Sequence, residues 1–256
     1  MFEKSGKILG TLLFILLVSG LFYLAFFHGK KTNNGDIRMI EVEGNHLLSA
    51  KDYLSFTKLN DNSDFVDLTL PEIKERFLKH PYIKRVELEY EGDHRVKVYI
   101  TEKDIEATLL TNGEPMLISD DFQVIPTLQD MKILDLPVIS NPDFNKKPPL
   151  LSYVKNDGVL QAFKIIEAAK LINKDIYKRL SEINLRNGGD IILTFSGVKP
   201  PVIYGKGEAA KKMVYLDVMW KSIISGDDIA ENSDYIDLRF SGEIFVGTSD
   251  KIGLTE

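Results

Sequence analysis

The pattern of apolar and polar residues divides the sequence into one long apolar run and two stretches of shorter periodicity. Residues 8–27 carry no charged side chain and are broken only by glycine, serine and threonine. A helix of this length spans roughly 30 Å, the thickness of a bilayer's hydrocarbon core. The run continues into Phe26 and Phe27 without the small residues of a signal-peptide cleavage site. It therefore predicts an uncleaved transmembrane helix, preceded by a tail at 1–7. Lysines flank both ends, so charge bias leaves the orientation open.

A polar linker is expected at 28–36, followed from 37 to 103 by a strand, two helices and two strands. The first strand ends at Gly44-Asn45, a pair typical of turns, and Pro81 ends the second helix. The order is supported by helix-start residues, by apolar positions on one helix face and by alternating strand positions. These residues are Ser49, Asp52, Thr69, Pro71, Ile73, Phe77, Val86, Leu88, Tyr90, Val96, Val98 and Ile100.

From residue 104 the pattern becomes β-rich. Short strands are expected at 106–110, 115–119 and 122–127, and a proline-rich loop at 136–150. Further strands are expected on both sides of a turn at Asn187-Gly188-Gly189 and after Pro200-Pro201, which restrict the latter strand to an edge or to a strand start. Two amphipathic helices are predicted at 158–173 and 207–223. Their expected inward residues are Val159, Phe163, Ile166 and Leu171, and Met213, Leu216 and Trp220.

The last predicted strand, 235–247, shows strict alternation. Even-numbered positions from Ile236 to Val246 are apolar or glycine, and most odd-numbered positions are polar. The pattern predicts one long half-buried strand, which Gly242 could bend. No later strand is predicted to pair with it, so we expect it to form an open edge of the sheet.

Composition narrows the possible functions. The 256 residues suffice for one large or two small domains. Lys and Arg number 32 against 38 Asp and Glu, a formal charge of −6, which argues against a nucleic-acid-binding surface. The sequence has no cysteine, which excludes disulfides, thiolate chemistry and cysteine-based metal sites.

Histidines and nucleophiles do not form a recognisable catalytic pattern. The four histidines lie at 28, 46, 80 and 94 without metal-ligand spacing, and none lies in the β-rich part to act as a base. His80, just before Pro81, is expected to interact with the last helical carbonyls. We therefore expect no metal site.

Two further motifs fit structural roles better than catalytic ones. The stretch 205–212 lacks the spacing of a phosphate-binding loop, so we interpret it as a helix N-terminus with Lys211 and Lys212 on a solvated face. The acidic pairs Asp120-Asp121 and Asp227-Asp228 fit turns better than paired glycosidase carboxylates. We expect neither an enzyme nor a cofactor or small-molecule ligand.

Several segments carry a resemblance to known proteins. The stretches "IEVEGNHLLS", "DLTLPEIKERFLKHPYIKRVELEY" and "VKVYITEK" resemble a POTRA domain. With the apolar span before them and a β-rich part ending in "IDLRF", the whole order resembles the bacterial cell-division family FtsQ, called DivIB in Gram-positive bacteria. The resemblance covers 8–247, most sharply at "VEGN", "HPYIKRVELEY", "LPVIS", "SEINLRNGGDIILTF", "YGKGEAAKK" and "YIDLRFSG".

The resemblance implies an α+β fold. An N-terminal transmembrane helix at 8–27 would precede a POTRA domain (β-α-α-β-β) at 37–103. A β-rich domain with an open edge and two helices would follow at 104–247, with a flexible tail at 248–256. The tail 1–7 would be cytoplasmic, and everything after His28 periplasmic. The chain would then be a single-pass type II protein of the bacterial cytoplasmic membrane at the division septum.

The resemblance also implies partners. Family members are non-enzymatic divisome scaffolds that bind FtsB and FtsL and link to FtsK and to the FtsW–FtsI septal peptidoglycan synthase, with no nucleic acid involved. An ungapped alignment on "IDLRF" carries the family's FtsB contact onto the last strand, where β-augmentation would use main-chain hydrogen bonds. The expected docking residues are Arg239, Phe240, Ser241, Gly242, Glu243 and Ile244.

Three of these residues have expected roles. Arg239 could pair with a partner carboxylate, Phe240 could anchor in or beside the core, and Gly242 could permit close backbone approach. A weaker candidate, for FtsK, is the charged face of the second POTRA helix at Lys74, Arg76 and Lys79.

Two alternatives stay open at this point. The residues of the last strand could be ordinary sheet residues without a partner. The chain could also be a POTRA-containing envelope-assembly or secretion adaptor. Such a protein is expected to carry a β-barrel or several POTRA copies, neither of which is predicted.

Overall fold

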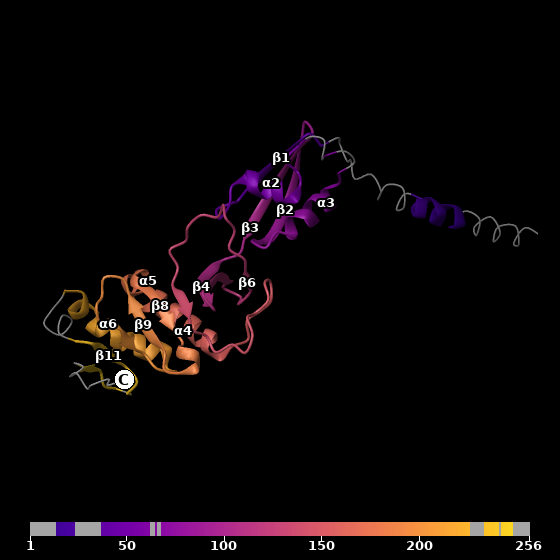
Figure 1. Cartoon of the computed structure of the whole chain (residues 1–256). Coiled ribbons are helices and arrows are strands. Elements are labelled where there is room, and N and C mark those ends of the chain that lie inside the picture. Colours follow the sequence, from indigo (N-terminus) through magenta and orange to yellow (C-terminus); the bar gives the residue numbers. More distant parts are fainter. Residues whose placement is uncertain are drawn as a thin grey trace, which may run out of the picture. The chain divides into compact units, whose positions relative to one another are not determined.

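The computed structural model describes residues 14–23, 37–61, 65, 68–225, 233–240 and 242–247 (Figure 1). Residues 14–23 are helical, and the rest of the transmembrane helix expected at 8–27 lies outside the described residues. So do the tail at 1–7, the linker at 28–36, the Asp227-Asp228 pair and the tail at 248–256. Within the described part, no helix is both long and apolar enough to cross a membrane.

The chain forms two compact units. The division falls between Thr101 and Glu102, and the short segment His46–Leu48 belongs to the second unit. The first unit is a three-stranded sheet of order β1-β3-β2, with β1 and β3 parallel, and two helices. This confirms the predicted order of strand, helix, helix, strand and strand. The elements are β1 (Met39–Glu43), α2 (Ala50–Thr57), α3 (Leu70–Leu78), β2 (Ile83–Gly92) and β3 (Arg95–Glu102).

Capping boxes start both helices of this unit. The Ser49 hydroxyl accepts from the Asp52 amide while the Asp52 carboxylate accepts from the Ser49 amide, and Thr69 and Glu72 repeat the arrangement. Each box satisfies amides that lack a partner within the helix. The helices bury aromatic and aliphatic side chains, among them Tyr53, Ile73 and Phe77, each 0% exposed.

His80 belongs to this core. Its ring is 2% exposed and lies 4.6 Å from the Tyr53 ring and 5.4 Å from the Tyr82 ring, measured between centroids. Its Nδ1 accepts a hydrogen bond of 3.1 Å from the Tyr82 amide. We expected this side chain to interact with the last helical carbonyls; the structure shows it packed as an aromatic core residue.

Gly44 explains the end of β1. Its φ is +84°, and a Cβ atom there would lie 2.3 Å from the carbonyl oxygen of Ile100 on β3. Only glycine therefore allows the two backbones to approach this closely. In the second unit, the Glu102 carboxylate accepts from the amides of His46 and Leu47 at 2.8 and 3.0 Å, which fixes the segment that follows this turn.

We predict that Gly44→Ala lowers the free energy of unfolding by about 2–4 kcal/mol, because it combines positive-φ strain with a backbone clash. The matched control is Gly92→Ala, whose φ of +80° is similar but whose Cβ would have no neighbour within 4 Å. That change should cost about 1 kcal/mol. Urea unfolding followed by circular dichroism measures both, and equal losses would show that the approach to Ile100 is unimportant.

The second unit is built on a nine-stranded sheet of order β12-β11-β10-β9-β8-β7-β4-β5-β6. The pairs β4–β7, β7–β8 and β10–β11 are parallel, and the others are antiparallel. The strands are β4 (Ile105–Thr111), β5 (Glu114–Ser119), β6 (Val124–Ile125), β7 (Val138–Ser140), β8 (Leu180–Asn184), β9 (Ile192–Phe195), β10 (Val202–Ile203), β11 (Tyr235–Asp237) and β12 (Phe245–Gly247). The helices are α4 (Asp157–Ile172), α5 (Lys174–Arg179) and α6 (Ala209–Ser225).

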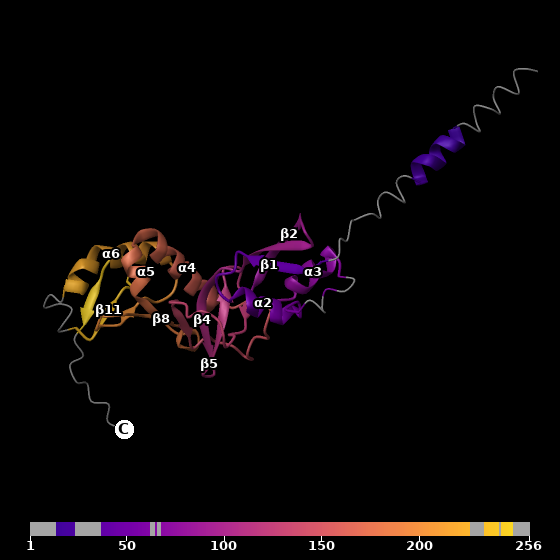
Figure 2. The same cartoon turned by 90° about the horizontal axis from the view of Figure 1, so that it is seen from above.

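Helices α4, α5 and α6 lie on one face of this sheet (Figure 2). Their inward side chains form one core with the strands, and Val159, Phe163 and Ile166 of α4 and Met213, Leu216 and Trp220 of α6 are buried, as predicted. The Trp220 indole nitrogen donates to the Asp175 carboxylate at 2.7 Å, which ties α6 to α5.

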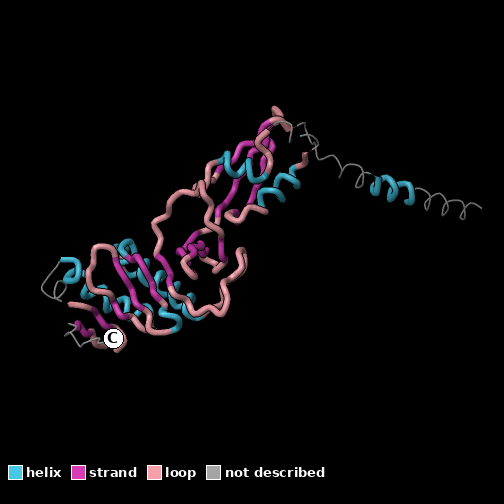
Figure 3. The backbone as a smooth tube through the Cα atoms, viewed as in Figure 1, coloured by secondary structure: helices cyan, strands magenta, loops and turns pink. Residues whose placement is uncertain are grey.

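Two expectations for this unit were wrong. Leu171 is 86% exposed because it lies about 140° around the helix from the inward Ile166. The described part of this unit contains three α-helices rather than two, since the six-residue α5 is too short to show a clear periodicity. The proline-rich stretch 136–150 is mostly loop, as predicted, although Val138–Ser140 form the interior strand β7 (loops are pink in Figure 3).

The two edges of the sheet differ. At the β6 edge, the Val124 amide donates to the Ser152 carbonyl at 2.9 Å and the Leu151 amide donates to the Val124 carbonyl at 2.7 Å. The segment 151–153 therefore covers that edge. At the other end of the sheet lies β12, which pairs with β11 on one side; among the described residues no segment pairs with its other side.

Candidate functional site

The predicted strand 235–247 is two short strands. Tyr235–Asp237 forms β11 and Phe245–Gly247 forms β12, and the two pair antiparallel. The expectation of one long strand was therefore wrong. The chain reverses between them, and Gly242, the position expected to bend it, has a φ of +86°. Five of the expected docking residues, Arg239, Phe240, Gly242, Glu243 and Ile244, lie in this connection, and Ser241 lies outside the described residues.

The hydrogen bonds of β11 determine which backbone groups of β12 face outward. The amides of Ile236 and Leu238 donate to Pro201 and Ile203 on the β10 side, at 3.0 and 2.9 Å. Because successive amides of a strand point to opposite sides, the amides of Tyr235 and Asp237 face β12. Tyr235 is opposite Gly247, and Asp237 is opposite Phe245. The N–H and C=O of Val246 therefore point away from the sheet.

Apolar side chains are exposed beside this edge. Phe240 and Phe245 are 52% and 46% exposed, and their ring centroids lie 5.0 Å apart at an interplanar angle of 76°. Val246 is 40% exposed. We call Phe240, Phe245 and Val246 the edge patch. An apolar cluster around an uncovered strand is typical of an interaction surface.

The Arg239 side chain is held by carboxylates of its own chain. Its Nε and Nη2 donate to the Asp237 carboxylate at 3.0 and 2.6 Å, and its Nη1 donates to Asp190 at 2.9 Å. These bonds raise the pKa of Arg239, and the bond from Arg239 is the main reason that the pKa of Asp237 is lowered. A contact of Arg239 with a partner carboxylate stays a prediction. Within the chain, the side chain joins β11 to the loop before β9.

Lys212 completes this charge cluster and was misplaced by the sequence analysis. We expected it on a solvated face, but it is 5% exposed. Its Nζ donates to the carbonyls of Tyr204 and Lys206, both at 2.8 Å, and burial lowers its pKa. One signal could have found it, because Lys212 lies four positions before the inward Leu216 and so shares its helix face.

The charged POTRA positions do not form one face. Arg76 donates to the Lys58 carbonyl at 3.4 Å, and Lys79 pairs with Glu75 at 2.8 Å. By helical geometry Lys74 lies about 200° around α3 from Arg76. A partner contact at these residues stays a prediction.

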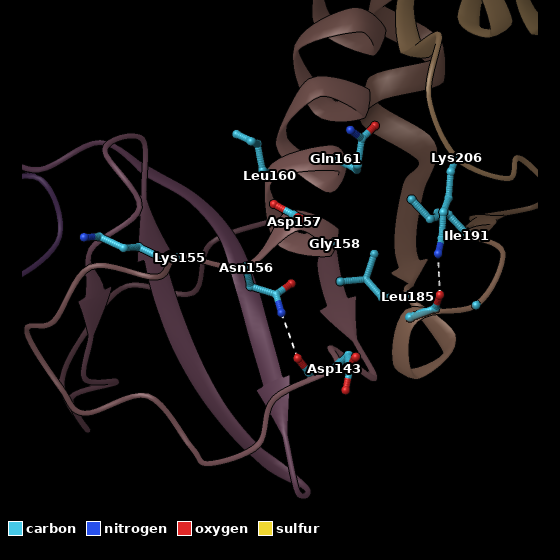
Figure 4. A pocket seen from close by; sticks show the side chains of 12 residues that line it. Asp143, Lys155, Asn156, Asp157, Gly158, Leu160, Gln161, Leu185, Ile191 and Lys206 are labelled. Carbon is cyan, nitrogen blue, oxygen red and sulfur yellow. Dashed lines mark hydrogen bonds between the residues drawn. The ribbon is translucent and has the colours of Figure 1, made fainter.

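A cleft of about 630 Å³ lies at the N-terminus of α4 (Figure 4). Two of the polar side chains that line it bond within the chain: Asn156 caps α4 and donates to the Asp143 carbonyl, and Lys206 donates to the Gly188 carbonyl. The described residues contain no group of three histidine, aspartate or glutamate side chains able to hold a metal ion.

The two units correspond to two domain families of known proteins. Residues 36–103 match the family described as "POTRA domain, FtsQ-type", and residues 107–239 match "Cell division protein FtsQ/DivIB, C-terminal". The chain belongs to the FtsQ/DivIB family, as its sequence motifs predicted.

A full-length relative supports this assignment. "Cell division protein FtsQ" of Geotalea daltonii is 24% identical over 250 residues, which cover 95% of this chain and 87% of the relative. Family membership indicates a role in bacterial cell division.

We predict that the Asp237 carboxylate stabilises the fold at neutral pH but not in strong acid. Its pKa is lowered in the folded state from the ordinary 3.8, so its contribution is present above that value and is lost as the pH falls through the folded pKa. Asp237→Asn should therefore cost about 1–3 kcal/mol near neutral pH and less at an acidic pH below the ordinary pKa of the carboxyl group.

Urea unfolding at both pH values measures this difference. The control is Asp130→Asn, which changes an exposed loop carboxylate and should leave the stability nearly unchanged. A cost for Asp237→Asn that does not depend on pH would contradict the charged pairing with Arg239.

Proposed function

We propose that this chain is a non-enzymatic scaffold of the bacterial divisome. In this proposal the helix expected at 8–27 anchors it in the cytoplasmic membrane, with the tail 1–7 in the cytoplasm and both compact units in the periplasm at the septum. The FtsQ/DivIB family assignment supports this proposal over the envelope-assembly alternative, because the match extends beyond the POTRA unit to residues 107–239.

The observation that carries the proposal is the edge at β12, which no described segment covers. Proteins normally protect sheet edges, and this chain does so at β6 with residues 151–153. At β12 the outward groups of Val246 are available to a further strand. We propose that a segment of FtsB pairs there by β-augmentation, with main-chain hydrogen bonds supplying affinity.

The edge patch would supply specificity. Phe240 and Phe245 form an exposed aromatic pair next to β12, and large aromatic side chains of this kind often dominate binding energy. From the sequence, the segment around Phe240 was expected to pair with the partner strand. The proposal now assigns the backbone pairing to Val246 and makes Phe240 a side-chain anchor. Gly242, Glu243 and Ile244 connect the two.

Other partners are proposed more broadly. FtsL would bind together with FtsB, and FtsK and the FtsW–FtsI synthase would be linked through the assembled complex. Lys74, Arg76 and Lys79 remain the proposed POTRA residues for FtsK, with Lys74 on a separate flank of α3.

We predict that Val246→Pro weakens FtsB binding about tenfold or more, because it removes the outward N–H without touching the β11–β12 hydrogen bonds. The matched control is Val246→Ala, which shortens the side chain but keeps the N–H. Affinity for an FtsB ectodomain peptide, measured by calorimetry, should separate the two variants, and recruitment of FtsB to midcell should follow the same order. Equal affinities would rule out pairing at this edge.

We predict that Phe240→Ala also weakens FtsB binding about tenfold or more, with less than about 1 kcal/mol lost in stability because the ring is half exposed. Leu171→Ala is the matched control, since it removes an even more exposed apolar side chain from α4. Peptide titration and thermal unfolding of both variants test this expectation. It fails if the two variants bind alike.

A further inference from the structure

Lys212 is a buried lysine whose ammonium group binds the backbone of segment 204–206, which directly follows β10. Its Nζ donates to the carbonyls of Tyr204 and Lys206, the two residues that flank Gly205. Tyr204 and Gly205 in turn donate their amides to the Ile191 carbonyl at 2.8 and 3.0 Å. The segment 204–206 is therefore fixed from two sides.

Gly205 lies between the two cations of the cluster. A Cβ atom there would lie 2.8 Å from Cγ of Arg239 and 3.5 Å from Nζ of Lys212, and its φ is +67°. The stem of Arg239 thus packs directly on the backbone that Lys212 holds. A displacement of this segment would therefore move the Arg239 side chain and, through its hydrogen bonds, Asp237 on β11.

The terminal hairpin, which we define as β11, β12 and their connection, has a narrow attachment to the sheet. Its partner β10 is two residues long, and two amide hydrogen bonds, from Ile236 and Leu238, run to the β10 side. Within the described residues β12 pairs with β11 alone. The burial of Ile236 and Leu238, the packing of Ile244 against the core and the charge cluster also connect the hairpin to the rest of the second unit.

Carboxylates balance the charge of Lys212. Asp190, Asp237 and Glu208 all interact favourably with its ammonium group. Asp190 and Asp237 are also the two carboxylates that bind Arg239. Asp190 and Asp237 therefore interact both with Lys212, which binds segment 204–206, and with Arg239, which follows β11.

We propose that Lys212 is a positioning residue for partner docking: by fixing segment 204–206 under the Arg239 stem, it holds the terminal hairpin in the register that presents the β12 edge. The consequence for docking rests on the function proposed above, whereas the effect on the hairpin itself does not. Lys212 would therefore control an edge that it does not touch.

The test compares Lys212→Met with Lys211→Met, which removes the same charge from the adjacent, more exposed lysine. Amide hydrogen exchange of the free protein, followed residue by residue, reports on Ile236, Leu238, Phe245 and Gly247. We expect Lys212→Met to speed exchange of these amides about tenfold or more while amides of β4 and β5 keep their protection. Lys211→Met should exchange like the wild type. Equal hairpin exchange in the two variants would overturn the proposal.

A second variant covers the case in which Lys212→Met does not fold. Asp190→Ala removes a carboxylate with 40% side-chain exposure and with it the acceptor of the Nη1 bond of Arg239. It should speed exchange of the same four amides, and unchanged exchange would overturn the proposal.

Titration with the FtsB peptide then separates the two proposals. Weaker binding by Lys212→Met than by Lys211→Met supports positioning for docking, and equal binding overturns it. A wild type that does not bind the peptide, with hairpin exchange still dependent on Lys212, refutes the proposed function and leaves the positioning of the hairpin standing.

Discussion

The Arg239 guanidinium, which is held by the Asp237 carboxylate, connects the terminal hairpin to Asp190 in the loop before β9. A two-residue strand offers few backbone hydrogen bonds, so β10 alone provides a narrow support for β11. Arg239 adds a bidentate bond to Asp237 at 3.0 and 2.6 Å and a third bond to Asp190. Since β12 pairs with β11, we infer that these bonds also help to position the β12 edge, which no described segment covers.

The second unit treats its two edges differently, and this difference connects fold to function. Residues 151–153 pair with β6 and remove one site of unwanted association. At β12 the outward backbone of Val246 and the exposed rings of Phe240 and Phe245 combine hydrogen-bonding capacity with apolar surface. Such a surface fits the proposed scaffold function, whereas Asn156 and Lys206 in the cleft at α4 bond within the chain.

Much of the fold could be predicted from sequence because its signals are local. Capping residues such as Ser49 and Thr69, the turn glycine Gly44 and the period of Met213, Leu216 and Trp220 each act within a few residues. The site was predicted less well. The alternation across 235–247 does not distinguish one long strand from two short ones, and only the chain reversal around Gly242 does.

The sequence by itself determined the order of elements in the POTRA unit and the family, and it directed the docking proposal to the stretch near "IDLRF". The tertiary structure alone decided that Lys212 is buried, that Arg239 is bound to Asp237 and Asp190, and that Val246 faces outward. The physical reason is the separation in sequence between the residues that interact. Caps, turns and helix periods follow from neighbours in sequence, whereas burial of a lysine and the free side of a strand depend on residues brought together from β9, β10, α6 and β11.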